Sequence, residues 1–391
     1  MMNKVLILSN KIPYPAEDGS SIAMARLLEA FEATNAFEIW YYAINPEKHT
    51  KNPDVFNSKA LGVHFKHFNW NTSPSVSGAF INLISGSPYH VSRFFIPPVV
   101  RELHAFKDQF FDTILLEGAF MGQYFDLAKQ KAQRVILRAH NVEWEIWDRL
   151  SQNESNPIKK SYLNLQSKRL ERFESDLSQK VDAIWTISIK DSIWFKRFNE
   201  NVGFFPNTVI EQAPPSKIEP KICHHLGALD WAPNVQGIQW FLDEVWPLVL
   251  QQIPEAEFHI AGNNPPNNLA FNTIENVHFH GRVADANQFR EAYGISIVPL
   301  LAGSGMRIKI LELAAQGIPM VSTPIGAEGI FEFSTENNFI QSEPEQMATV
   351  LVQLMLHPDH ALSQGLKTRE DILNRFGMDA TLQALNTLWE Q

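Results

Sequence analysis

The sequence predicts an α/β fold made of two doubly wound parallel sheets. Short apolar runs alternate with helical patterns along the chain, which is typical of a parallel sheet with helices on both faces. The alternation stops in a proline-rich stretch at 205–220 and then starts again. A chain of 391 residues with 45% hydrophobic residues is also long for one domain and can bury two cores. We therefore expect two domains, at 1–208 and 209–375.

The first domain is expected to contain short, mostly apolar strands, which suit a buried sheet. The expected strands are 5–9, 37–42, 63–67, 113–116, 134–138 and 183–186. Apolar residues at helical spacing predict helices at 20–33, 98–106, 123–131 and 157–178. The last of these should be one long polar helix that places Leu163, Leu170, Phe173 and Leu177 on a single face.

The second domain repeats this alternation. Its expected strands are 222–227, 257–261, 277–281, 296–300 and 320–323, and its expected helices are 235–251, 307–316 and 344–356. An amphipathic helix is expected at 380–389. The carboxyl ends of parallel strands carry the ligand sites of such folds, so the loops after these strands are where chemistry is expected.

The charge and composition argue against several classes of protein. The formal net charge of −10 disfavours nucleic acid as the main partner. The single cysteine, Cys223, excludes an intramolecular disulfide and fits a reducing compartment. No apolar run approaches the roughly 18 residues of a membrane-spanning helix. The N-terminus also lacks the pattern of a signal peptide, so we expect a cytoplasmic protein.

Small and polar residues follow the first expected strand. Asp18, Gly19 and Ser20 open a helix, where Gly19 would let the backbone approach a ligand closely and Ser20 could donate to a phosphate. The simpler interpretation is that Asp18 or Ser20 caps the helix, and local sequence favours it.

Four polar side chains follow the fifth expected strand directly. They are Arg138, His140, Asn141 and Glu143. A lone histidine in such a place is usually a core residue, but four polar groups beyond a buried strand are hard to explain by packing. We therefore favour a functional site here.

A glycine loop between a strand and a helix is the strongest local signal. Gly303, Ser304 and Gly305 precede a helix whose first turn carries Arg307 and Lys309, and Glu312 follows one turn later. A helix N-terminus with two cations suits a diphosphate, although an ordinary strand-to-helix turn could look the same. The two cations face about 200° apart, so we expect only one to reach the phosphates. We favour Arg307, which is nearer the loop; Lys309 could be a solvated surface residue.

The motifs together resemble the family-4 retaining glycosyltransferases of the GT-B fold, such as those that build bacterial cell-surface polysaccharides. The first half contributes Pro13-Tyr-Pro15 with Asp18-Gly19, Leu137-Arg-Ala-His140-Asn-Val-Glu143 and Phe205-Pro-Asn-Thr-Val209. The second half contributes Gly227-Ala-Leu-Asp-Trp231-Ala-Pro233-Asn234, Gly281-Arg-Val-Ala-Asp285, Gly303-Ser-Gly-Met-Arg-Ile-Lys-Ile-Leu-Glu312, and Gly317-Ile-Pro-Met-Val-Ser-Thr323 with Gly326-Ala-Glu-Gly329. Their order and spacing are more specific than any one of them.

The resemblance implies two facing Rossmann-like domains with a cleft between them. The second domain would hold a nucleotide-diphosphate sugar and the first the acceptor, with the terminal helix, 376–391, packing back on the first domain. Glu312 would accept hydrogen bonds from the ribose hydroxyls, and His140 would contact the sugar near its reacting carbon. The remaining residues that the resemblance implies around the donor are Gly19 at the diphosphate, the backbone of Gly303–Gly305 at the sugar or phosphates, and Arg282 and Val283 beside the base.

Some positions depart from the family pattern. Ser304 stands where the family usually has a glutamate, and Ala228 and Gln236 stand where it often has an arginine and a lysine. Diphosphate charge would then fall to Arg307 or Lys309. The departures keep open an alternative function, a catalytically inactive or weak sugar-nucleotide-binding protein on the same fold.

The resemblance implies hexosyl transfer with retention of anomeric configuration, and we expect neither a cofactor nor a metal. Stabilisation of the departing diphosphate would carry most of the catalysis. Glu143 could act as a base or could orient His140. The chain has no Asp-x-Asp motif, and its histidine pairs, including His278 and His280, lack acidic partners at ligand spacing along the sequence, so no metal site is expected. A nicotinamide enzyme is disfavoured because G-x-G-x-x-G is missing after the first strand. Base, sugar and acceptor are not determined.

A peripheral membrane contact is a further hypothesis. The stretch 158–172 is rich in Lys and Arg, and apolar residues gather at 80–84 and 94–96. Together they could dock on anionic lipid at the inner face of the membrane and reach a lipid-linked acceptor. The acidic residues of 171–176 favour the alternative, an ordinary solvated helix.

Overall fold

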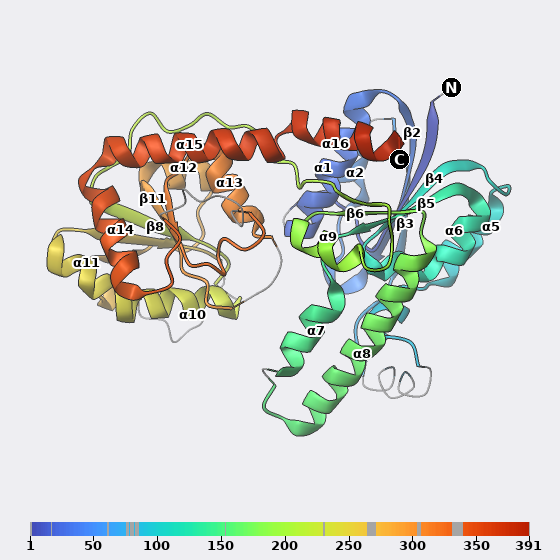
Figure 1. Ribbon diagram of the computed structural model, residues 1–391, viewed down its shortest axis with the longest axis horizontal. Helices are drawn as coiled ribbons and strands as arrows, with labels where there is room; N and C mark the ends of the chain where they lie inside the picture. The colour runs from blue at the N-terminus through green and yellow to red at the C-terminus, as the bar shows by residue number, and fades with distance from the viewer. Residues whose placement is uncertain are drawn as a thin grey trace. The chain divides into compact units, whose positions relative to one another are not determined.

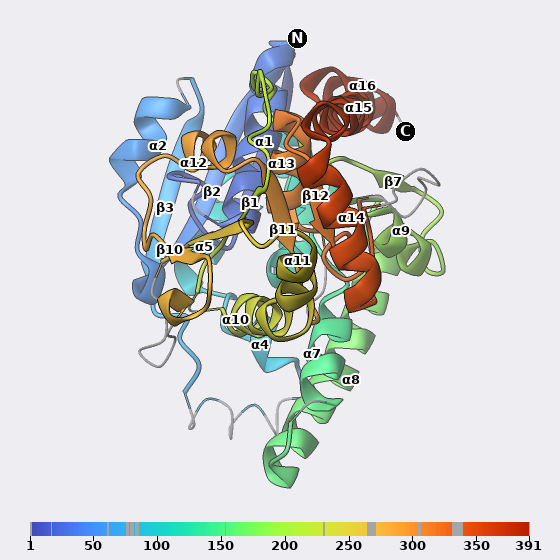
Figure 2. The same ribbon diagram turned by 90° about the vertical axis from the view of Figure 1, so that its left-hand side faces the viewer.

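The computed structural model describes residues 2–16, 18–60, 62–75, 78, 82, 86–152, 154–229, 231–263, 271–302, 306–330 and 339–390. The chain forms two compact units. Unit 1 comprises Met1–Thr208 with Thr381–Gln391, and unit 2 comprises Val209–Ala380. Each unit is a parallel sheet with helices packed on it, as the sequence predicts (Figures 1 and 2).

The sheet of unit 1 has the strand order β3-β2-β1-β4-β5-β6-β7, and its neighbouring strands pair in parallel. The strands are β1 Asn3–Ser9, β2 Phe37–Pro46, β3 His64–Trp70, β4 Phe111–Glu117, β5 Ala132–Ala139, β6 Ala183–Thr186 and β7 Val202–Phe204. The order reverses between β1 and β4, which is the point where open α/β sheets bind ligands. The register there pairs Ser9 with Glu117 and Glu117 with Arg138, so these three residues form one row at the carboxyl edge.

Helices pack around this sheet. They are α1 Gly19–Thr34, η1 Glu47–His49, α2 Pro53–Lys59, α4 Tyr89–Ser92, α5 Pro97–Ala105, η2 Ala119–Tyr124, α6 Phe125–Lys131, α7 Glu143–Gln152, α8 Pro157–Lys180, α9 Ile189–Phe195 and α16 Met378–Glu390. The buried core combines apolar residues of β1, β2, β4 and β5 with residues of the helices, among them α5, η2 and α9.

The C-terminal helix α16 contributes to unit 1. The ring of Trp389 lies 4.6 Å from that of Phe37 and 5.8 Å from that of Phe31. Its backbone oxygen accepts a hydrogen bond of 3.0 Å from Arg134 Nη1. The hydroxyls of Thr208 and Thr381, both buried, lie 2.8 Å apart, so the residue at which the chain leaves unit 1 contacts the residue at which it returns.

Helices α7 and α8 lie side by side as a hairpin that extends beyond the sheet of unit 1 (Figure 1). Leu170 and Leu177 are buried, in agreement with the predicted apolar face. Glu174 of α8 is also buried, and its two carboxylate oxygens accept hydrogen bonds of 3.0 and 2.8 Å from the backbone N–H groups of Glu143 and Trp144. Glu174 therefore caps the N-terminus of α7, and its assignment to a solvated helix face was wrong.

The sheet of unit 2 has the order β10-β9-β8-β11-β12, again with parallel neighbours. The strands are β8 Ile222–Leu226, β9 Glu257–Ala261, β10 Val277–Phe279, β11 Ile295–Val298 and β12 Met320–Ser322. The helices are α10 Ala232–Trp240, η3 Phe241–Val245, α11 Trp246–Gln252, η4 Phe271–Thr273, α12 Ala286–Ala292, α13 Ile308–Gln316, α14 Pro344–Leu356 and α15 Pro358–Phe376. Figure 1 shows α12, α13 and α15 on one side of this sheet and α10 and α11 on the other.

Prolines set two boundaries that differ from the prediction. The helix expected at 235–251 is divided by a π-helical turn, Phe241–Val245, just before Pro247. A proline inside a helix lacks an N–H and collides with the carbonyl four residues earlier, and a wider turn relieves both problems. Strand β11 likewise ends before Pro299. Among the described residues, no helix is both long and apolar enough to cross a membrane.

Candidate functional site

A buried ion pair lies at the switch point of unit 1. Glu117 ends β4 and Arg138 lies near the end of β5, and both side chains are 0% exposed. Arg138 Nη1 donates to Glu117 Oε1 over 2.6 Å and also to the backbone oxygen of Ala23 over 3.3 Å. Burying two charges costs free energy, so an ion pair held at a ligand-binding edge is a candidate for a functional group.

His140 joins this pair. Its Nε2 lies 2.5 Å from the same Oε1 of Glu117, and its side chain is 10% exposed. Burial alone would raise the pKa of Glu117, but the charge of Arg138 and the contact with His140 hold that pKa below its ordinary value. Burial also lowers the pKa of His140, although Glu117 opposes this effect. At neutral pH the carboxylate of Glu117 therefore accepts the Nε2–H of a neutral imidazole, whose Nδ1 remains an acceptor.

Glu117 is the functional candidate that sequence reasoning missed. It ends the run Ile114-Leu-Leu-Glu117-Gly118, and a single acidic residue at the end of an apolar strand is a usable signal. Its Oε2 and the Nε and Nη2 of Arg138 are buried and have no hydrogen-bond partner within the described part of the chain. This leaves hydrogen-bonding capacity at the centre of the cluster for water or a ligand.

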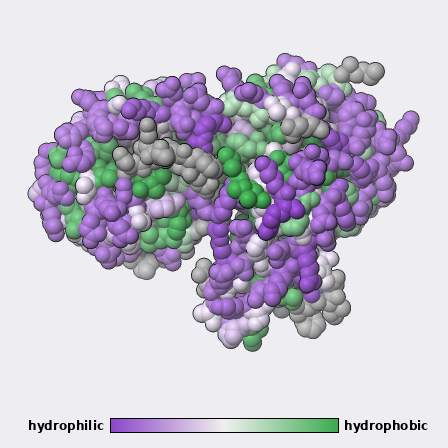
Figure 3. All heavy atoms as spheres, in the orientation of Figure 1, coloured by the Kyte–Doolittle hydropathy of each residue, from purple (hydrophilic) through white to green (hydrophobic). Residues whose placement is uncertain are grey.

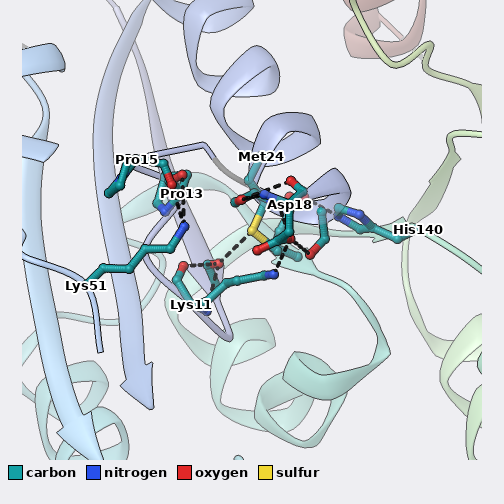
Figure 4. A network of polar contacts seen from close by, with 11 residues as sticks. Lys11, Pro13, Pro15, Asp18, Met24, Lys51 and His140 are labelled. Carbon is teal, nitrogen blue, oxygen red and sulfur yellow. Dashed lines mark hydrogen bonds and ion pairs between the residues drawn. The ribbon is translucent and has the colours of Figure 1, made fainter. Parts of the chain in front are cut away.

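Asp18 caps helix α1 next to this cluster. Asp18 Oδ1 accepts hydrogen bonds from the backbone N–H of Ser21, from Ser20 Oγ and from Lys11 Nζ, at 3.0, 2.9 and 2.7 Å. The simpler interpretation of this loop, a capping aspartate, is confirmed for Asp18. Figure 4 shows Lys11 and Asp18 in the same neighbourhood as His140. Burial would raise the pKa of Asp18, but Lys11 and these hydrogen bonds hold it well below its usual range.

Asn141 and Glu143 follow His140 in the sequence, and their side chains contact each other. Glu143 is the first residue of α7, and Asn141 Nδ2 donates to its Oε1 over 3.5 Å. Burial raises the pKa of Glu143 to about 7, although Asn141 opposes this. The carboxylate in contact with His140 is thus Glu117, and a role for Glu143 in orienting His140 finds no support in these contacts.

A cavity of about 590 Å³ opens beside Lys11 and Asp18 in unit 1. Four of its lining side chains are cations and one is an acid: Lys11, Lys48, Lys51, Arg93 and Asp18. Lys51 Nζ donates to the backbone oxygen of Pro15 over 2.6 Å, and Arg93 Nη1 donates to that of Thr72 over 3.0 Å. The chain as a whole has a net charge of −10, so this concentration of positive charge is local and specific.

In unit 2, Lys309 lies at the carboxyl edge of the sheet. It is the second residue of α13, and a Cβ at Gly227, just after β8, would lie 2.5 Å from Lys309 Nζ. Burial lowers the pKa of Lys309 to about 8; the Arg290 charge adds to this and Glu312 opposes it. Lys309 is half-buried and thus not a fully solvated surface residue, and a Cβ at Gly227 would force the end of its side chain to shift.

Glu312 is held by a residue that the sequence did not suggest. Arg290 of α12 donates from Nη2 to Glu312 Oε2 over 3.1 Å, and the side chains are 6% and 38% exposed respectively. The exposed fraction of Glu312 leaves carboxylate surface for another donor. No short-range pattern links positions 290 and 312, because α12 and α13 are separated by β11 in the sequence.

The other predicted donor residues are placed as follows. Arg307 is the N-cap of α13, half-buried, with its guanidinium 5.6 Å from the ring centre of Trp231. Its backbone is extended, with φ −90° and ψ 93°, so Arg307 precedes the helix and its expected place in the first helical turn was wrong. Arg282 is exposed and Val283 half-buried in the loop after β10. Gly303, Ser304 and Gly305 lie outside the described residues.

An apolar cavity of about 240 Å³ is also present in unit 2, lined by residues of β12, α14 and α15. Its charged or titratable lining is limited to His360. A cavity without cations does not suit a diphosphate, so we do not assign it to the nucleotide.

The apolar side chains proposed for a membrane contact are mostly not available. Phe94 and Ile96 are 7% and 0% exposed, so their assignment to a lipid-facing patch was wrong; Phe95 is 44% exposed. Of 80–84, all except Asn82 lie outside the described residues. On the face seen in Figure 3, hydrophilic residues dominate the α7–α8 hairpin, although Ile158 is 81% exposed.

Comparison with known proteins identifies the fold. TarM of S. aureus superposes with a TM-score of 0.69 at 12% identity, over 100% of this chain and 99% of that one. HepE of Anabaena, in complex with UDP, gives 0.67 at 14% identity over 99% and 100%. Sucrose-phosphate synthase of Thermosynechococcus elongatus gives 0.66 at 15% identity over 100% and 99%. The chain has the GT-B fold.

The sequence comparisons concern the functional class of the protein. Residues 220–357, within unit 2, match the family model described as glycosyl transferases group 1. Over 351 residues the chain is 23% identical to an uncharacterized 44.6 kDa protein in the cps region of Klebsiella pneumoniae, covering 84% of each. Together these findings support a glycosyltransferase of the GT-B fold.

Proposed function

We propose that the protein transfers a hexose from a nucleotide-diphosphate sugar to an acceptor with retention of anomeric configuration, using neither metal nor cofactor. The observation that carries this proposal is the group Lys309, Arg290 and Glu312 at the carboxyl edge of unit 2, within the segment that matches the glycosyl transferase model. It supplies a cation for a diphosphate and a positioned carboxylate for sugar hydroxyls.

The donor would be held mainly by α13. Glu312 would accept the ribose hydroxyls with the part of its carboxylate that Arg290 does not occupy. Lys309, beside the N-terminal turn of α13, would neutralise the diphosphate together with the helix dipole. Arg307 would assist from the N-cap. The backbone of Gly303–Gly305 would touch the sugar or phosphates, and Arg282 and Val283 would border the base.

The groups of unit 1 would act on the sugar and acceptor. Glu117 fixes the tautomer and orientation of His140, and Arg138 keeps Glu117 ionised. His140 would then present a neutral, preorganised imidazole near the reacting carbon. Gly19 would approach the diphosphate. The hydroxyl of Ser20 donates to Asp18, so we propose no phosphate contact for it.

Departure of the diphosphate leaves negative charge on phosphate and positive character on the anomeric carbon. Stabilising the leaving group would therefore be the main catalytic contribution. Attack on the face from which the diphosphate departs would give retention without a protein nucleophile. Of the two roles predicted for Glu143, we propose the base, because a carboxyl with a pKa of about 7 suits proton transfer at neutral pH.

The cationic cavity of unit 1 suggests the chemistry of the acceptor. We propose that the acceptor carries phosphate or carboxylate groups, as a lipid-linked sugar or an acidic polysaccharide would. The similarity to a protein in a cps region favours polysaccharide synthesis. Lys48 lines this cavity and is exposed, so Lys48→Gln should raise the acceptor KM and leave donor hydrolysis unchanged. An unchanged KM for a charged acceptor would contradict this assignment.

Release of nucleoside diphosphate tests the proposal. Purified protein would be screened by thermal shift against UDP, GDP and ADP sugars, because ligand binding stabilises the folded state. UDP comes first, since HepE was solved with UDP. Turnover of the stabilising sugar should be lost in Glu312→Ala and His140→Ala and retained in the matched exposed variants Glu345→Ala and His104→Ala. Binding without turnover in the unaltered protein would instead favour a non-catalytic sugar-nucleotide-binding protein.

A further inference from the structure

Histidine and glutamate side chains gather at the edge of the sheet in unit 2. Glu257 and His259 are on β9, His278 is on the edge strand β10, and His280 follows β10. Residues two apart in a strand share a face, and the register pairs His259 with His278. The parallel pairing therefore brings all four side chains to one face of the sheet, although they are far apart in sequence.

The spacing of three of these side chains fits a metal ion. His259 Nε2 lies 3.1 Å from Glu257 Oε2, and His278 Nε2 lies 3.6 Å from the same oxygen. The ligand atoms of the three residues all lie within 4.8 Å of one another. Tetrahedral zinc with bonds of about 2.0–2.1 Å places its ligand atoms roughly 3.3 Å apart. Two of the three separations are already close to this value, and rotation of the half-exposed His278 can close the third.

His280 provides the outer partner that metal-binding histidines use. Its Nε2 lies 2.9 Å from His259 Nδ1, while His259 Nε2 faces Glu257. A metal on Nε2 requires the proton on Nδ1, and His280 can accept that proton in a hydrogen bond. The ring of His259 also stacks on Tyr293 at 4.0 Å, and the residue is 6% exposed. The central ligand is therefore fixed in orientation before any ion binds.

The exposure and the chemical types of these side chains also favour metal binding over a purely structural stack of rings. The side chains of Glu257 and His278 are 46% and 50% exposed, so an ion can enter from solvent and water can complete its coordination. Two imidazoles and a carboxylate suit zinc or a similar divalent transition metal better than magnesium or calcium. The cluster was not predicted because Glu257, the acidic partner, comes from the neighbouring strand.

We propose that Glu257, His259 and His278 bind one divalent transition-metal ion of the zinc type, with His280 as hydrogen-bonded support. The ion would tie the short edge strand β10 to β9. It would also rigidify the contact with Tyr293, which directly follows α12, the helix whose Arg290 holds Glu312. The site is separate from the transfer chemistry and does not depend on the proposed function.

Metal binding to the full chain tests this site directly. Chelator-treated protein would be titrated with ZnCl₂ by calorimetry at pH 7.5, and cobalt(II) would report tetrahedral coordination by its visible absorption. We expect one zinc ion to bind tightly to each chain. His278→Ala and Glu257→Gln, both at half-exposed positions, should weaken it by more than about 100-fold, beyond the loss of an outer partner. His280→Phe should weaken it by about 10–100-fold.

A matched control is available in unit 1. His64 Nε2 lies 3.4 Å from Glu38 Oε1 across strands β3 and β2, which reproduces one histidine–glutamate pair of the proposed site. His64→Ala should keep the tight equivalent. Absence of a tight equivalent in the unaltered protein would overturn the proposal. So would retention of that equivalent in both His278→Ala and Glu257→Gln, provided that circular dichroism shows all variants folded.

Discussion

We predict that the lowered pKa of Lys309 makes nucleotide binding depend on pH. Burial lowers this pKa to about 8 from its ordinary 10.5, so about nine-tenths of the free protein carries the charge at pH 7 and about one-tenth at pH 9. A diphosphate beside the ammonium group would raise the pKa again, because an opposite charge favours the protonated form. Binding above pH 8 must therefore take up a proton. The Kd for UDP should rise about tenfold between pH 7 and pH 9, which is ~1.4 kcal/mol.

Calorimetry at several pH values measures this effect. At pH 8.5, titrations in two buffers of different ionisation enthalpy should report roughly three-quarters of a proton taken up per UDP bound. Lys309→Arg is the control, because arginine stays charged over this range and the ligand titrates identically in both proteins. The reasoning is refuted if the Kd of the unaltered protein is constant with pH, or if Lys309→Arg shows the same rise.

Three further predictions concern both units. Glu117→Gln leaves the buried charge of Arg138 uncompensated and should lower the free energy of unfolding in urea by about 3–5 kcal/mol; a loss below about 1 kcal/mol would contradict the pairing. Burial raises the pKa of Glu143 to about 7 from 4.5, so the stability that its protonated form supplies below pH 4.5 is lost as pH rises through 7. Glu143→Gln should therefore stabilise by up to about 3 kcal/mol at pH 8.5 and by little at pH 5, and equal effects at both pH values would count against this. Gly227→Ala places a Cβ 2.5 Å from Lys309 Nζ, 2.8 Å from His225 Nε2 and 2.9 Å from Asn234 Nδ2, and it should weaken UDP binding by about tenfold or more in calorimetry; unaltered affinity would argue for a diphosphate bound elsewhere.

Much of the fold was predictable because its signals are local. Apolar runs bounded by turn residues predicted most strands of both sheets, since a strand that is buried on both faces consists almost entirely of apolar residues. The short strand β7, Val202–Phe204, was missed because it is too short to show a pattern. Helix α7 was missed for a different reason, because it carries polar residues along most of its length and its N-terminus is capped by Glu174 from another helix. A cap from a residue of another helix produces no pattern in the sequence around the helix N-terminus.

The candidate site was predictable where it depends on loops after strands, and not where it depends on pairing between distant elements. His140, Lys309 and Glu312 follow or begin elements that the sequence indicates. Their partners, Glu117 and Arg290, come from elements that are adjacent only in three dimensions. The expectation of opposite faces for Arg307 and Lys309 assumed that both are helical, whereas Arg307 is the extended N-cap of α13. The surroundings of the Lys309 side chain could not be predicted, because its Nζ lies beside Gly227, the residue directly after β8.

The contact between Thr208 and Thr381 has a consequence for the connectivity of the molecule. Because the chain leaves unit 1 at one of these residues and re-enters it at the other, the two units are joined by a pair of covalent linkers that start side by side. A protease that cuts one linker would leave the halves tethered through the second, so a single nick should yield two fragments on a denaturing gel and one species in gel filtration. The terminal helix therefore provides the second connection between the units, and its removal would leave them joined by a single linker.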